Sequence, residues 1–262
     1  MMSFLQQLEY RDESLFIFGL CNLFSAALYI VFSFFSKTLI LGVNAWIKPI
    51  KFALSIGIFS LTMGWFIADL NAPAITNIYN WAVIIFLGFE NVYIAIQAAR
   101  GQLSHFNRSS PLYAFMFVLM GLAAALTTLF TGYIGLLFLS QDFPALPAYY
   151  LLAIRLGIFL FVIFSFQGAM MGAKLSHTIG GEDGGPGIPI LNWSTQYGDL
   201  RIAHFIGMHA LQLLPLLSFY VFKNVFTTAI AGILYALLAI YTLLRAQKAR
   251  PLFGKIFKNS VQ

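Results

Sequence analysis

The sequence has few charges and almost no cysteine. Only 9% of its 262 residues are charged, whereas a soluble domain carries roughly 25%. So few charges cannot solvate the surface of a water-soluble protein, and we therefore expect lipid to cover most of the chain. The single cysteine, Cys21, excludes an intrachain disulfide and a metal site made of several thiolates.

Other absences exclude whole classes of membrane protein. The last apolar stretch contains no lysine between Asn224 and Leu244, so it cannot form the Schiff base of a retinal protein. A Gly-x-Ser-x-Gly nucleophile elbow is also missing, which argues against a serine hydrolase. The first residues are acidic rather than basic, so we do not expect a cleavable signal peptide.

Long apolar runs are what the sequence does contain. Hydrophobic residues make up 60% of it, and a bilayer core takes about 20 helical residues. We predict an all-α, polytopic transmembrane bundle of about seven helices that forms one integral membrane domain. The spans are expected at roughly 15–36, 46–69, 75–99, 112–139, 147–171, 201–222 and 224–245. A tight turn at Lys223 and Asn224 should make the last two an antiparallel hairpin.

Loops that contain lysine and arginine alternate along the chain with loops that contain few of them. This alternation predicts the orientation of the protein in the membrane. The basic loops contain Lys37, Arg100, Arg108, Lys174, Arg201 and the tail residues Arg245, Lys248, Arg250, Lys255 and Lys258. Because cytoplasmic loops are enriched in Lys and Arg, we place the N-terminus outside and the C-terminus in the cytoplasm. We expect the plasma membrane, which in bacteria is the inner membrane. Arg11 and Lys223 depart from this pattern, and we interpret the basic tail as lipid-facing rather than as a nucleic-acid site.

The longest loop, residues 172–200, is rich in glycine. No strand precedes Gly180–Gly187 and no Gly-Lys-Ser/Thr follows, so the segment lacks a P-loop signature. We interpret it as a flexible cytoplasmic loop whose later part, Ile188–Tyr197, folds back on the bundle as a lid. Asp199 is then the N-cap of the following helix.

The few polar residues inside the spans fall at one depth. At 1.5 Å per helical residue, Lys51 and Glu90 lie about 8 Å from the cytoplasmic edge, His204 about 5 Å and His209 about 12 Å. Asn44 and Lys51 are spaced to lie on one helical face of the second span, and Gln97 shares a face of the third span with Glu90. Because ionisable groups in hydrocarbon are costly, this cytoplasmic layer is our candidate functional site. Arg155 lies apart from it.

Roles follow from residue type. Glu90, His204 and His209 are the candidate catalytic residues. His105, His204 and His209 are the candidate ligands of haem or a divalent metal, with His209 and His105 the most plausible haem pair. Candidate binding residues for an anionic head group of a lipid or other apolar substrate are Lys48, Lys51, Gln97, Arg100 and Gln212. No spacing among these residues is diagnostic of a known site.

Three functions remain open at this stage. One is a metal- or haem-dependent membrane enzyme or redox protein. Another is a proton-coupled small-solute transporter, although the outer half offers few polar groups for a pathway. The third is a structural subunit, in which the lysines reach the head groups, Glu90 pairs with Lys51 or His209, and the histidines only join helices.

Overall fold

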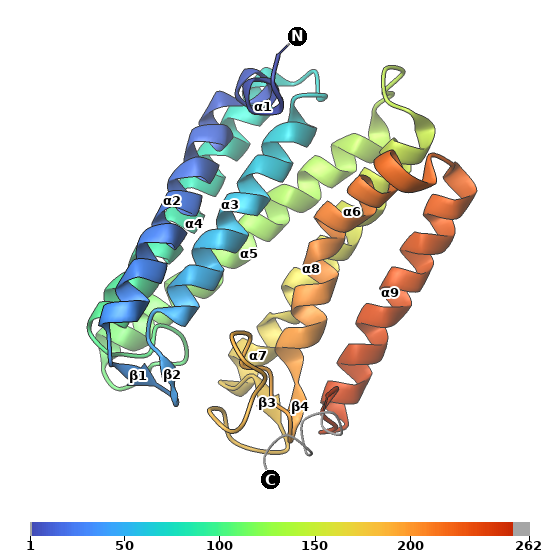
Figure 1. Cartoon of the computed structure of the whole chain (residues 1–262). Coiled ribbons are helices and arrows are strands. Elements are labelled where there is room, and N and C mark those ends of the chain that lie inside the picture. Colours follow the sequence, from blue (N-terminus) through green and yellow to red (C-terminus); the bar gives the residue numbers. More distant parts are fainter. Residues whose placement is uncertain (1, 254–262) are drawn as a thin grey trace. The chain divides into compact units, whose positions relative to one another are not determined.

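The computed structural model describes residues 2–253, and helices dominate it (Figure 1). Within that range seven helical segments are long and apolar enough to cross a membrane. They are α2 (Glu13–Phe35), α3 (Ile47–Ile67), α4 (Pro73–Ala99), α5 (Pro111–Ser140), α6 (Ala148–Gln167) followed by α7 (Ala169–Lys174), α8 (Leu200–Leu217) followed by the π-helical turn η1 (Ser218–Phe222), and α9 (Val225–Gln247). The predicted seven-span α-helical protein is confirmed. Lys255 and Lys258 lie outside the described residues.

Polar caps begin several of these helices. The side chain of Asp12 accepts a hydrogen bond from Leu15 N at 2.9 Å, and Ser110 accepts one from Tyr113 N at 3.2 Å. Asp199 accepts from Arg201 N at 3.0 Å, so the predicted cap of α8 is confirmed. Each cap satisfies a backbone N–H that the helix itself leaves unpaired.

The chain divides into two compact units, residues 1–141 and 142–262. The first contains a short helix α1 (Phe4–Arg11), helices α2 to α5, and a hairpin of β1 (Leu39–Ile40) and β2 (Val43–Asn44). The second contains α6 to α9 and the antiparallel pair β3 (Thr178–Ile179) and β4 (Gly198–Asp199).

In the first unit, buried polar pairs join α2 to α4. Asn80 Nδ2 donates to Asp12 Oδ2 at 2.7 Å, and Asn91 Nδ2 donates to Asn22 Oδ1 at 2.8 Å. The two contacts recur about three helical turns apart on both helices, as expected for helices that run in the same direction. Interhelical hydrogen bonds of this kind hold membrane helices together where hydrocarbon offers no partner.

The short helix α1 was not predicted, and it explains one exception in the charge pattern. Arg11, its last residue, forms a 2.6 Å ion pair with Asp69 and donates to the carbonyl of Trp65. Its guanidinium also lies 4.4 Å from the centre of the Trp65 ring. Arg11 is therefore neutralised at the predicted outer end, and its charge does not conflict with the assigned orientation.

In the second unit, small residues bring α6 and α8 into close contact. A Cβ added at Gly157 would lie 3.0 Å from the carbonyl oxygen of Ala210, and one at Gly207 would overlap the ring of Phe164. Phe164, Ala203 and Ala210 belong to the buried core that these helices share with α9. The predicted hairpin of α8 and α9 is confirmed, with Lys223 in the left-handed region and Asn224 capping α9.

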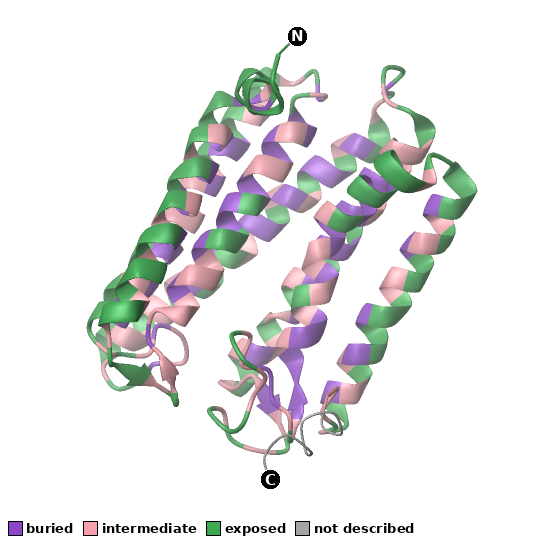
Figure 2. Ribbon diagram, in the orientation of Figure 1, coloured by how far each residue is buried: buried purple, intermediate pink, exposed green. Residues whose placement is uncertain are grey.

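Exposed residues occur along the helices of both units (Figure 2), and many of them are large and apolar. Phe24 on α2 is 72% exposed, Val118 on α5 is 65% exposed and Ile233 on α9 is 61% exposed. Exposed apolar surface on this scale is stable in hydrocarbon and would not be stable in water. The surface therefore supports a protein that is covered by the lipid bilayer.

One detail of the predicted polar faces was wrong. Asn44 lies in β2, before α3 begins at Ile47, so it does not extend the helical stripe of Lys48 and Lys51. Instead its Nδ2 donates to the carbonyls of Ser33 and Ser36 and closes the end of α2. Helix α4 ends at Ala99 and Gly101 adopts φ +65°, so Ser104 and His105 lie in a loop.

We predict that Gly207→Ala lowers the free energy of unfolding by about 1–3 kcal/mol, because the new methyl group overpacks a site filled by Phe164. Thermal unfolding of the detergent-solubilised protein measures the change. Gly172→Ala is the matched control, since no atom lies within 4 Å of a Cβ added there. Equal unfolding midpoints for the two variants would contradict the close helix contact.

Candidate functional site

The predicted site residues occur in both units. Lys48 and Lys51 lie on α3, Glu90 and Gln97 on α4, Arg100 at the C-cap of α4, and His105 in the following loop. His204, His209 and Gln212 lie on α8 in the second unit. The layer that would join all of them spans both units, so its existence stays a prediction.

Glu90 is a buried carboxyl in the membrane-spanning part of α4. Only 6% of its surface is exposed, and the positive charge of Lys48 acts on it. Among the described residues the structure gives Glu90 no hydrogen bond and no ion pair within 4.0 Å. Helix packing therefore does not account for this carboxyl, in contrast to Asp12, which caps α2 and bonds to Asn80.

Gln97 lies on the same face of α4, two turns closer to the predicted cytoplasmic end. Its Nε2 donates to the hydroxyl of Tyr93 at 2.7 Å, whereas its Oε1 is buried and has no partner among the described residues. Tyr93 lies between Glu90 and Gln97 on this face. Tyr93 was not among the residues predicted from the sequence. Its spacing of three residues from Glu90 and four from Gln97 could have placed it on their face of the helix.

Aromatic rings connect Lys48 to His105. The Lys48 ammonium lies 5.8 Å from the centre of the Phe52 ring, and that ring lies 5.5 Å from the His105 ring. Ser104 Oγ lies 3.2 Å from His105 Nδ1. His105 is therefore packed at the predicted cytoplasmic end of the first unit, as a loop residue.

His204 in the second unit has a fixed ring orientation. Its Nδ1 lies 2.6 Å from the carbonyl oxygen of Phe164 on α6. That carbonyl is available because α6 ends nearby, where Gly168 N–H donates to Ser165 O instead. A carbonyl can only accept, so Nδ1 carries the hydrogen and Nε2 presents a lone pair. Gly168 leaves room for the ring, since a Cβ there would lie 2.8 Å from His204 Cε1.

His209 is held by residues of its own helix. Its Nδ1 lies 3.3 Å from Gln212 Oε1, and its ring lies 4.3 Å from that of Phe205. Phe205 in turn contacts Trp193 of the long loop, with ring centres 5.5 Å apart. The predicted return of this loop to the helices is confirmed at Trp193.

The long loop is more ordered than its glycine content indicates. Asp183 accepts hydrogen bonds from the Ser176 hydroxyl, the Thr178 hydroxyl, and the backbone N–H groups of His177 and Thr178. It also pairs with His177 Nδ1 at 2.9 Å. Burial alone would raise the pKa of Asp183, but its bonds to His177 and Thr178 and the charge of His177 outweigh burial and lower it.

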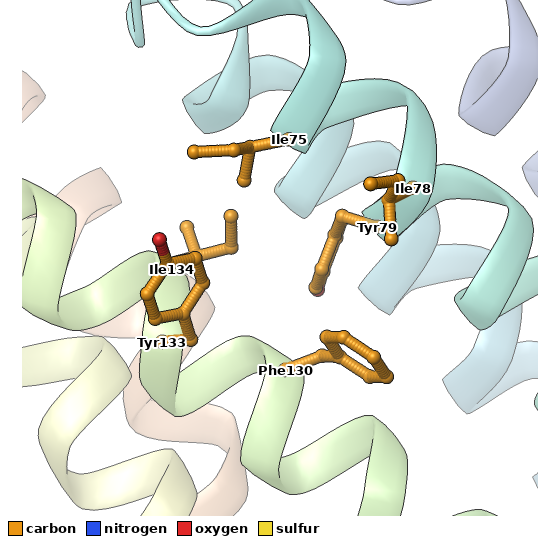
Figure 3. Close-up of a pocket in the computed structure, with 6 residues that line it drawn as sticks. All are labelled: Ile75, Ile78, Tyr79, Phe130, Tyr133 and Ile134. Carbon is orange, nitrogen blue, oxygen red and sulfur yellow. The ribbon is translucent and has the colours of Figure 1, made fainter.

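A pocket between α4 and α5 lies away from these residues (Figure 3). Its lining consists of Ile75, Ile78, Tyr79, Phe130, Tyr133 and Ile134. The Tyr79 hydroxyl is already paired with Thr131 at 3.0 Å. None of the predicted site residues lines this pocket, and its lining contains no His, Cys, Asp or Glu side chain.

Comparisons with known proteins do not assign a function. The chain matches no family model, no curated protein and no solved structure. Among residues 2–253, no group of three or more His, Cys, Asp or Glu side chains is arranged to hold a metal ion. Function must therefore be inferred from the chemistry of the individual side chains.

Asp183→Asn should destabilise the second unit by about 2 kcal/mol at neutral pH, because it removes the charge that accepts these bonds. A carboxyl whose pKa is lowered on folding stabilises the protein above its unfolded pKa of about 3.9, and this contribution is lost as pH falls through the lower folded value. Unfolding in detergent should therefore separate wild type from variant at pH 7 and less so toward pH 3.

The matched control is Asp142→Asn, since Asp142 is exposed. It should unfold like wild type throughout this range. A constant difference between Asp183→Asn and wild type at all pH values would contradict the assignment of the stabilisation to the Asp183 charge.

Proposed function

We propose that this integral membrane protein is a membrane-embedded redox protein or enzyme that binds haem iron, or another metal, through Nε2 of His204. The observation that carries this proposal is the 2.6 Å contact from His204 Nδ1 to the Phe164 carbonyl. Histidines that bind metals usually donate their other ring N–H to a carbonyl or carboxylate, which fixes both tautomer and orientation. His204 has this arrangement in the membrane-spanning part of the chain.

Haem iron needs fewer ligands from the protein than other metal centres do. Haem iron takes one or two axial ligands from the protein and draws its other four from the porphyrin. The structure orients His204 better than His209, the ligand that the sequence favoured, because His204 Nδ1 is held by a neighbouring helix and at a shorter distance. In the proposal His209 carries protons or supplies a second ligand.

The remaining predicted residues have supporting roles in this proposal. In the first unit Lys48, Lys51 and Arg100 would bind the anionic head group of an apolar or lipid-like substrate, Gln97 would hydrogen-bond to it, and Glu90 would be the general base. In the second unit Gln212 would orient His209, whose Nδ1 lies 3.3 Å from its Oε1. We further propose that the protein works at the cytoplasmic face of the plasma membrane, since the candidate residues lie toward the Lys- and Arg-rich end of the spans.

A proton-coupled transporter is the second candidate. Glu90 favours it, because a buried carboxyl that has no hydrogen bond within the described part of the chain suits a group that is protonated and deprotonated during a transport cycle. Flux of protons and solutes into proteoliposomes would distinguish this function from redox or enzymatic activity.

The visible spectrum of the detergent-purified protein, together with elemental analysis, tests the haem and metal proposal. We expect a Soret band or a stoichiometric metal in wild type, lost in His204→Ala because the ligand is removed. His105→Ala should retain the Soret band or the metal. This result would show that the ligand is His204 and not the pair of His209 and His105. Absence of any band and of any metal from the wild-type protein would contradict the proposal.

A further inference from the structure

We propose that Glu90 exchanges a proton with the cytoplasmic side through Tyr93 and Gln97 of the same helix. The three side chains are spaced by three and four residues, so they lie on one face of α4. From Glu90 to the end of the helix at Arg100 this face covers about 15 Å. The route therefore joins a buried carboxyl to the predicted cytoplasmic edge of the span, and it is independent of haem or metal binding.

Burial distinguishes this face from an ordinary lipid-facing one. Glu90 is 6% exposed, Tyr93 8% and Gln97 1%. Polar side chains so well buried in a membrane span require either protein partners or a function. The structure provides one partner contact, the 2.7 Å bond from Gln97 Nε2 to the Tyr93 hydroxyl oxygen.

That contact leaves two groups available for proton transfer. Because the Tyr93 oxygen accepts from Gln97, the hydroxyl hydrogen of Tyr93 remains free to be donated. Gln97 Oε1 is buried with no partner among the described residues, so it can accept a hydrogen bond from a water molecule. Gln97 is thus a positioning residue, which holds the phenol and a water together, whereas Tyr93 carries the proton.

The surrounding charges suit transfer between Glu90 and the cytoplasm. Lys48 of α3 acts on Glu90, and Arg100 and Tyr113 act on Tyr93 from the end of α4 and from α5. Helix α2 contributes the uncharged Asn22, which is bonded to Asn91. Lys48 favours the Glu90 carboxylate, whereas the hydrocarbon environment favours the neutral acid.

The step conserves atoms and charge. A hydronium ion at the water position gives its proton to the Tyr93 oxygen while the phenol proton moves to the Glu90 carboxylate through an intervening water molecule. The products are a neutral Glu90, an unchanged Tyr93 and a water molecule. Deprotonation of Glu90 follows the same path in reverse.

Infrared spectroscopy of the full-length protein in detergent or lipid tests the route. The carbonyl stretch of protonated Glu90 is identified as the band that Glu90→Gln removes, and its shift after transfer to D₂O gives the rate of proton exchange. We expect Tyr93→Phe and Gln97→Leu each to slow this exchange about ten-fold or more, as for loss of a positioned proton-transfer group.

Two features keep the test decisive. Tyr133→Phe, an exposed tyrosine of the same unit, should exchange at the wild-type rate and controls for general loosening of the helices. Tyr93→Phe keeps the ring, and Gln97→Leu leaves the phenol in place, so the two variants test the route separately. Wild-type exchange rates in both, or no protonated Glu90 band at any pH at which the protein stays folded, would overturn the proposal.

Discussion

Hydrocarbon offers no hydrogen-bond partner, so every polar group inside a membrane span must be satisfied by the protein or be kept for another reason. Most polar side chains of these helices are satisfied by neighbours. Asp12 with Asn80 and Asn22 with Asn91 join α2 to α4, Tyr79 bonds to Thr131, and the Ser218 hydroxyl bonds to Thr228 and to the Tyr149 carbonyl. These contacts explain why the residues are polar without assigning them any chemistry.

The polar atoms left over mark the candidate sites. They include the Glu90 carboxyl, Gln97 Oε1 and His204 Nε2, for which the described residues provide no hydrogen bond. These three groups lie toward the end of the helices that the Lys and Arg distribution assigns to the cytoplasm. Asn80 Oδ1 is also buried without a partner among the described residues, but it lies near the opposite end of α4, and the Asn80 side chain is already bonded to Asp12.

The spans could be predicted because a run of apolar residues sets both secondary structure and environment. The N-cap at Asp199 followed from local sequence in the same way. The Asn pairs and the contact of His204 with Phe164 could not be predicted, because they depend on which helices become neighbours. The long loop shows the same limit, since its glycines suggested flexibility while Ser176, His177 and Thr178 converge on Asp183.

The orientation of His204 depends on small residues that sequence alone left without a role. Gly207 lets Phe164 pack against α8, and Gly168 lets the His204 ring lie against the end of α6. Together they place the Phe164 carbonyl where it can accept from Nδ1. The proposed function depends on this geometry more than on the presence of a histidine.

An experimental density map around His204 in the protein purified from membranes tests this most directly. We expect Nδ1 bonded to the Phe164 carbonyl and a bound atom about 2.0–2.1 Å from Nε2, the distance typical of a metal–imidazole bond. A ring rotated so that Nε2 bonds to another side chain of the protein would contradict it.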